Sequence, residues 1–187
     1  MGENKSSIKY HQDIPQWKWT MNLLKHFCQN VFISVSRDQY NDEESAIPKS
    51  LEIIDNYTSI GPIGGIASAM QIHPNVTWLI STIDQPAMNK KTLSHLITSL
   101  VEDAHGICYF EHINSKTFTQ PFPCILTSAC AKQVFDAVEG GTYSLQEIFN
   151  SLEIQKVKIK NPQEIRNLNT QKEKNSFWTR QQKNHPD

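Results

Sequence analysis

Near its middle the chain carries Val76-Thr-Trp-Leu-Ile-Ser-Thr-Ile83, followed directly by Asp84-Gln-Pro86. The first run is almost continuously apolar, β-branched or aromatic, which predicts a central strand covered on both faces. Ligands in open parallel sheets bind outside the carboxyl ends of the strands. Asp84 is therefore placed to hold a cation against a phosphate, and the alternative is an aspartate that caps the turn or the next helix.

The segments around this strand alternate between helical and strand patterns. We expect helices at 15–29, 66–71, 92–101, 129–138 and 144–152, and strands at 31–36, 51–54, 107–110, 122–126 and 156–159, the last at an edge. Such alternation predicts a three-layer α/β domain with a mostly parallel sheet. We expect the domain to span residues 1–173 and residues 174–187 to form a polar C-terminal tail.

Composition excludes several classes of protein. The chain of 187 residues, 38% hydrophobic and 20% charged, suits one domain with a sizeable core. A net charge of −1 with scattered Lys and Arg argues against nucleic acid as a partner. No apolar stretch approaches the roughly 20 residues of a membrane span, and no signal-peptide pattern is present, so we expect no membrane association and a cytoplasmic location.

Cysteine and histidine spacing offers no local metal site. The four cysteines are far apart in apolar segments, which predicts buried free thiols in a reducing compartment, and no two histidines have H-x-x-x-H spacing.

A second candidate site is the glycine-rich stretch Gly61-Pro-Ile-Gly-Gly65, which precedes the helix expected at 66–71. Glycines before a helix let backbone N–H groups approach a base or a phosphate closely. The stretch matches neither the P-loop nor the dinucleotide fingerprint, so a plain glycine-rich turn is the alternative.

The order of these pieces resembles the molybdenum cofactor guanylyltransferases. Met1-Gly-Glu-Asn-Lys5 resembles the end of that family's signature, L-A-G-G-x-S-x-R-M-G-x-D-K. The pieces that follow in the family's order are 10–16, 36–39, 54–55, 61–69, 84–86, 120–123 and 166–170, and the resemblance covers residues 1–173. It implies a Rossmann-like nucleotidyltransferase fold that binds GTP with Mg²⁺ and joins GMP to the terminal phosphate of molybdopterin. Molybdoenzymes or other proteins of the cofactor pathway would be its partners.

The resemblance also implies roles for individual residues. Lys5 would contact phosphate and Asp84 would ligate Mg²⁺, which makes these two the catalytic residues. The residues that would line the nucleotide, together with Lys5 and Asp84, are Asp55, Gly61, Pro62, Gly64 and Gly65.

Two asparagines match the family's N-x-N-T element at the pterin end, Asn167 and Asn169. Ser34 stands where some relatives carry a nucleotide-contacting Asn, and Asn4 replaces the usual Asp before the lysine. Without the resemblance, Lys5 would be a solvated terminal lysine, Asp55 a strand-end turn residue and the two asparagines turn formers.

The family's first strand and most of its glycine loop are expected to be missing from residues 1–187. A late start in the gene model and a degenerate paralogue would each explain this, and in either case we expect poor catalysis. The alternative functions are a non-catalytic relative that binds a pterin or a partner protein, and a transferase of another nucleotide, because fold does not settle substrate.

Overall fold

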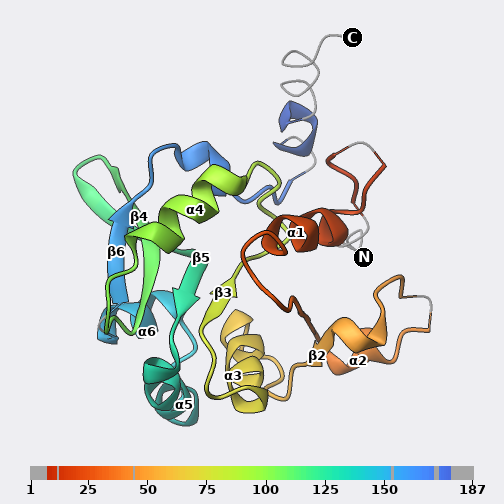
Figure 1. Ribbon diagram of the computed structural model, residues 1–187, viewed down its shortest axis with the longest axis horizontal. Coiled ribbons are helices and arrows are strands. Elements are labelled where there is room, and N and C mark those ends of the chain that lie inside the picture. Colours follow the sequence, from red (N-terminus) through yellow and green to blue (C-terminus); the bar gives the residue numbers. More distant parts are fainter. Residues whose placement is uncertain (1–7, 12, 44, 153, 171–172, 178–187) are drawn as a thin grey trace.

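The computed structural model describes residues 8–177 except 12, 44, 153 and 171–172 (Figure 1). Its named α-helices are α1 (Gln16–Leu24), α2 (Arg37–Tyr40), α3 (Pro62–Ile72), α4 (Lys90–Ser99), α5 (Ala131–Glu139) and α6 (Leu145–Ser151). Its strands are β1 (Ile33–Val35), β2 (Glu52–Ile54), β3 (Trp78–Ile80), β4 (Gly106–Ile113), β5 (Lys116–Leu126) and β6 (Ile154–Lys158). Residues 173–177 are also helical. Lys5 lies outside the described residues.

The strands form two sheets. One contains β1 and β2, which are parallel, and the other has the order β3-β5-β4-β6. In the larger sheet β5 is antiparallel to β3 and β4, whereas β4 and β6 are parallel, so only β5 runs against the others. The mostly parallel α/β fold and the edge position of the last strand are confirmed.

Helices cover both faces of β3, as its apolar run predicts. Leu79 packs on one face with residues of α1 and α4, while Trp78 and Ile80 pack on the other face against the core that α3, α5 and α6 share with the sheet. Figure 1 shows the corresponding arrangement, with α4 and α1 on one side and α3, α5 and α6 on the other. The three-layer prediction is confirmed, although β3 ends the four-stranded sheet instead of lying at its centre.

The glycine-rich stretch belongs to a helix and not to a loop. α3 begins at Pro62, so the expected helix start at Ile66 is wrong by one turn. Gly61 precedes the helix with φ of 73°, a conformation that favours glycine, and Pro62 then fixes a helical φ at the first position. Gly64 and Gly65 are therefore buried inside the first turns.

Two strands extend further than their apolar cores. β4 and β5 continue through polar residues to a tight turn at Asn114 and Ser115, which have φ of 47° and 64°. The expected range 107–110 ends too early and the expected range 122–126 begins too late, because the outer part of this hairpin is mostly exposed and carries little apolar signal. At the other end of the chain, α1 stops at Leu24, short of the expected residue 29.

All four cysteines are free, as predicted, and Cys108, Cys124 and Cys130 are fully buried. The predicted burial of Cys28 is wrong, because this residue is partly exposed. Burial raises the pKa of Cys108 to about 12 and that of Cys130 to about 11. These thiols are protonated near neutral pH, which leaves them packing residues and not nucleophiles.

The C-terminal segment packs on the N-terminal one. Phe177 is buried, and its ring centroid lies 5.7 Å from that of Tyr10. The division at residue 173 stays a prediction. None of the helices in the described part has the length and apolar character needed to cross a bilayer.

We expect Ile107→Ala to destabilise the fold by about 2–5 kcal/mol, because it opens a cavity in the core. Ile107 is fully buried, whereas Ile113 on the same strand is 45% exposed, so Ile113→Ala should cost about 0.5 kcal/mol or less. Chemical denaturation of both variants measures the difference, and equal losses would contradict the core described above.

Candidate functional site

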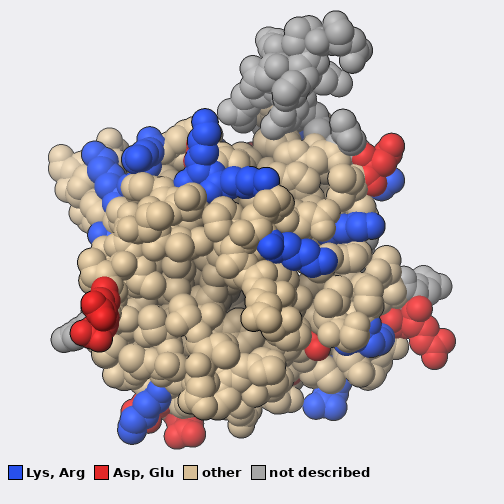
Figure 2. Space-filling model, in the orientation of Figure 1, with Lys and Arg blue, Asp and Glu red and all other residues tan. Residues whose placement is uncertain are grey.

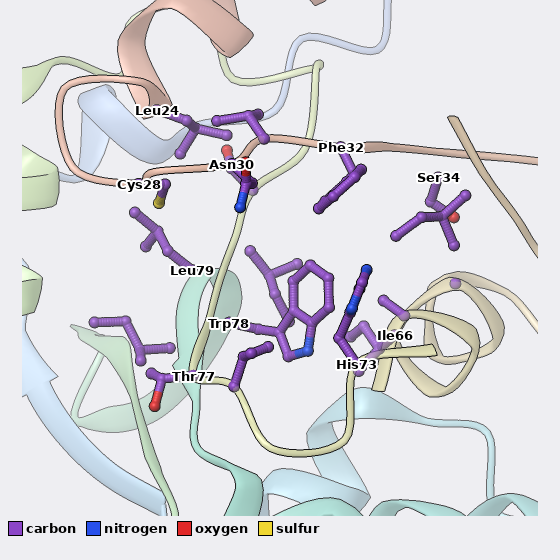
Figure 3. Close-up of a pocket in the computed structure, with 18 of the residues that line it drawn as sticks. Leu24, Cys28, Asn30, Phe32, Ser34, Ile66, His73, Thr77, Trp78 and Leu79 are labelled. Carbon is purple, nitrogen blue, oxygen red and sulfur yellow. The ribbon is translucent and has the colours of Figure 1, made fainter. Parts of the chain in front are cut away.

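A cavity of about 740 Å³ separates the two sheets, with β1 on one side and β3 on the other. Where β1 and β3 begin, the wall of the cavity is aromatic and is formed by Phe32, His73 and Trp78 (Figure 3). In Figure 2 the surface is hollowed beside β3, and Lys, Arg, Asp and Glu lie mainly away from this hollow.

The opposite end of the cavity is polar, because the carboxyl ends of three strands meet there. Ser34 comes from β1, Asp55 follows β2, and Ser81 and Thr82 follow β3. Polar groups at the carboxyl ends of parallel strands are the usual ligand contacts of an open α/β sheet. The predicted site residues Asp55, Pro62 and Gly65 line this cavity together.

Hydrogen bonds hold Asp55, which follows β2, beside the first turn of α3. Its backbone N–H donates to Val35 O at 2.8 Å, and its Oδ1 accepts the Tyr57 N–H at 2.8 Å. The Ser68 hydroxyl lies 3.3 Å from the same Oδ1 and 2.8 Å from Gly64 O, and its single proton favours the shorter contact. The side chain thus combines the expected strand-end turn with a place in the cavity wall.

Gly64 and Gly65 allow α3 to approach the small sheet. A Cβ at Gly64 would lie 2.4 Å from Tyr57 O and 2.9 Å from both Asp55 carboxylate oxygens. A Cβ at Gly65 would lie 2.4 Å from Ser34 Oγ. The missing side chains therefore serve helix packing, and the Gly64 N–H donates within the turn, to Gly61 O at 3.1 Å.

Asp84 lies just beyond the polar end of the cavity. Its Oδ1 accepts the hydroxyl proton of Thr82 at 2.6 Å, and Thr82 itself lines the cavity. The turn after Asp84 is fixed by Gln85, whose buried amide donates to Phe122 O and Ile165 O at 3.1 and 2.9 Å. Sequence reasoning missed Thr82 and Gln85, although both lie within two residues of Asp84 in the chain.

A histidine anchors the same turn from the N-terminal segment. His11 Nε2 lies 2.8 Å from Pro86 O, and its ring stacks on Trp19 with centroids 4.1 Å apart. Burial lowers the pKa of His11, so the neutral ring with its proton on Nε2 suits this contact.

Asn167 and Asn169 are exposed and flank a residue that contacts the Asp84 turn. Leu168 between them is buried, and its N–H donates to Asp84 O at 2.8 Å. The Asn169 N–H donates to Glu173 Oε2 at 3.1 Å, which fixes the backbone beyond it. The structure thus brings both asparagines to the same end of the sheet as Asp84.

The described residues contain no group of three or more His, Cys, Asp or Glu side chains that could hold a metal ion. A single carboxylate can still hold Mg²⁺ when phosphate oxygens and water supply the other ligands. Asp84 suits that role because Thr82 occupies one of its oxygens and no hydrogen bond from the described residues reaches the other.

Comparison with known proteins gives a consistent picture. A sequence model described as "MobA-like NTP transferase domain" matches residues 1–156. The molybdenum cofactor biosynthesis bifunctional protein of Synechocystis sp. is 28% identical over 174 residues, which are 91% of this chain and 48% of that protein. The chain thus spans about half the length of this curated relative.

Two solved structures share the fold. Molybdopterin-guanine dinucleotide biosynthesis protein A of Archaeoglobus fulgidus aligns with a TM-score of 0.76 and 16% identity, over 97% of this chain and 92% of that one. The 2-C-methyl-D-erythritol 4-phosphate cytidylyltransferase of Thermus thermophilus aligns with a TM-score of 0.73 and 8% identity, over 95% of this chain and 93% of that one.

Gly64→Ala should destabilise the protein by about 1–3 kcal/mol, because the new methyl group meets the backbone oxygen of Tyr57. A glycine-to-alanine change inside a helix otherwise gains about 0.5–1 kcal/mol. Denaturant midpoints measure the sign of the change, and a more stable Gly64→Ala protein would refute the packing described for α3.

The neighbouring glycine supplies a control. Gly65→Ala meets a side chain, so its cost should shrink when Ser34→Gly removes the hydroxyl. A double-mutant cycle on Gly65 and Ser34 measures that coupling.

Proposed function

We propose that this chain, which belongs to the MobA-like NTP transferase domain family, transfers GMP from GTP to molybdopterin and releases pyrophosphate. The chain is a nucleotidyltransferase of this type, and the choice of nucleotide and acceptor is the proposal. The observation that carries it is the polar end of the cavity, which Asp55 after β2 lines and beside which Asp84 follows β3, hydrogen-bonded to the lining residue Thr82. The named functions of the Synechocystis and Archaeoglobus proteins support the acceptor.

In this proposal the nucleotide lies against the β2 and α3 side of the site. Asp55 is rigid enough to accept hydrogen bonds from a base or a ribose, since Tyr57 already fixes one of its oxygens. Pro62 and Gly65 offer a wall with little side-chain bulk, while Gly61 and Gly64 set the course of the chain behind it. Lys5 would contact phosphate.

The reaction requires positioning and charge neutralisation more than covalent help. A terminal phosphate oxygen of molybdopterin attacks the α-phosphorus of GTP, a new P–O bond forms, and the bond to the β-phosphate bridging oxygen breaks. Pyrophosphate takes the electron pair of that bond. Asp84 would hold Mg²⁺, which offsets the charge on the α-phosphate when bound.

The acceptor would approach from the segment that follows the 3₁₀ turn at Pro162–Ile165. The side-chain amides of Asn167 and Asn169 both donate and accept hydrogen bonds, which suits the polar edge of a pterin. The contact from Leu168 to Asp84 keeps this segment beside the proposed metal ligand.

A second candidate is transfer of another nucleotide on the same scaffold. The similarity to a cytidylyltransferase fold supports keeping it, because the two solved structures have similar TM-scores and different named nucleotides. We also propose a cytoplasmic location, with partners among molybdoenzymes and proteins of the cofactor pathway.

Asp84→Asn should remove most Mg²⁺-dependent turnover, by about 100-fold or more, since a carboxylate-held ion contributes several kcal/mol to such transfers. GTP-dependent pyrophosphate release in the presence of molybdopterin measures turnover. Titration of GTP with and without Mg²⁺ measures whether the ion still tightens binding. Asp103→Asn, on an exposed turn, is the matched control and should behave like the parent protein. Parent-level turnover in Asp84→Asn would remove Asp84 from the mechanism.

GTP should bind more tightly than CTP or ATP. The small wall formed by Pro62 and Gly65 leaves backbone groups near the base edge, and such groups can distinguish guanine. Calorimetric titrations of the three nucleotides with Mg²⁺ compare their affinities. Equal affinities would defeat the guanylyl assignment, and a preference for CTP would favour the second candidate.

A further inference from the structure

Gln85 is a buried polar side chain beside the proposed metal ligand. It follows Asp84 directly in the chain and is only 3% exposed. A side-chain amide has two N–H protons, and here both are donated to backbone oxygens, to Phe122 O at 3.1 Å and to Ile165 O at 2.9 Å. These acceptors lie 37 and 80 residues away in the chain. One side chain thus ties the Asp84 turn to β5 and to the C-terminal part of the domain.

The same side chain also carries an unmet hydrogen-bonding group. Its Oε1 is buried and has no hydrogen-bond partner among the described residues. A buried acceptor without a partner costs free energy that an apolar side chain of similar length does not incur. Features that break the local rules of stability are expected mainly at functional sites. The amide of Gln85 is therefore kept for its two donated hydrogen bonds in spite of this cost.

Two hydrogen bonds hold residues 165–168 against the Asp84 turn. The Gln85 amide binds Ile165 O, and Asp84 O accepts the Leu168 N–H at 2.8 Å. We call these two hydrogen bonds the clamp. The first involves a side chain and the second only backbone groups, so a single substitution can remove the first and keep the second.

The two asparagines proposed to bind the acceptor belong to the clamped part of the chain. Asn167 lies between the two fixed points, and Asn169 directly follows the second. Their spacing from Asp84 therefore depends on the clamp. Because the rate of a group transfer falls steeply when a reactant is displaced by about 1 Å, such spacing matters to the reaction.

Other contacts anchor the preceding turn to the body of the domain. Thr92 of α4 donates its hydroxyl proton to the Glu164 carboxylate, and Ile165 is buried in a core that it shares with α4 and β4. These contacts do not involve Gln85, so we expect the turn to stay folded without the Gln85 amide. What the amide fixes is the distance between this turn and Asp84.

We propose that Gln85 is a positioning residue, which sets the place of the acceptor relative to Asp84 by holding residues 165–168. Both of its N–H groups are bound within the protein, so it acts through the backbone of Ile165 and not by contact with a substrate. The acceptor role rests on the proposed function, whereas the clamp does not.

The test compares Gln85→Met with Gln163→Met in the full chain. Methionine has nearly the length of glutamine and donates no hydrogen bond. Gln163 is exposed in the neighbouring 3₁₀ turn, which makes it the matched control. In equilibrium titrations Gln85→Met should bind molybdopterin at least tenfold more weakly, with an affinity for GTP within twofold of that of the parent protein. Gln163→Met should match the parent protein for both ligands.

Hydrogen exchange tests the clamp without any substrate. The Leu168 amide should exchange at least tenfold faster in Gln85→Met, because the segment has lost one of its two points of attachment. The amides of β4 should exchange at the parent rate. General destabilisation would speed both, and thermal unfolding measures it separately. Gln85→Asn is the milder variant. It keeps the amide on a side chain shorter by about 1.5 Å and should fall between the parent protein and Gln85→Met in every measurement.

The outcomes separate this inference from the proposed function. Exchange of Leu168 at the parent rate in folded Gln85→Met and Gln85→Asn proteins would overturn the clamp, whatever the ligands do. Equal weakening of molybdopterin and GTP binding would overturn the acceptor role, because a change confined to residues 165–168 affects one ligand only. If the parent protein binds no molybdopterin, the proposed function fails together with the acceptor role of Gln85, while faster exchange at Leu168 would still establish the clamp.

Discussion

The close approach of α3 to the small sheet is the contact on which the rest of the site depends. Gly65 lies against the Ser34 hydroxyl of β1, and Gly64 lies against the loop that follows β2. Side chains at these two positions would push the helix away from both strands. Because α3 also packs on α5 and the larger sheet, it links the two sheets, and its depth of packing sets the width of the cavity between them.

This arrangement divides the proposed site into two halves. Asp55 belongs to the half made of β1, β2 and α3, while Asp84 belongs to the half that begins at β3. The second half is the more firmly fixed, because backbone and side-chain hydrogen bonds from His11, Gln85 and Leu168 converge on the turn around Asp84. Phosphate transfer depends on distances held to a fraction of an ångström, so the spacing of the halves matters as much as the groups they carry.

The sequence predicts the local features of this site better than its assembly. The apolar run at 76–83 correctly indicates a strand that is covered on both faces and followed by Asp84. Both features depend only on the order of neighbouring residues in the chain. It cannot indicate that β3 ends the larger sheet, since strand order depends on partners far away in the chain. The start of α3 was misplaced for a similar reason. Glycines favour a loop by propensity, and only contacts with Ser34 and Tyr57 explain why they lie in a helix.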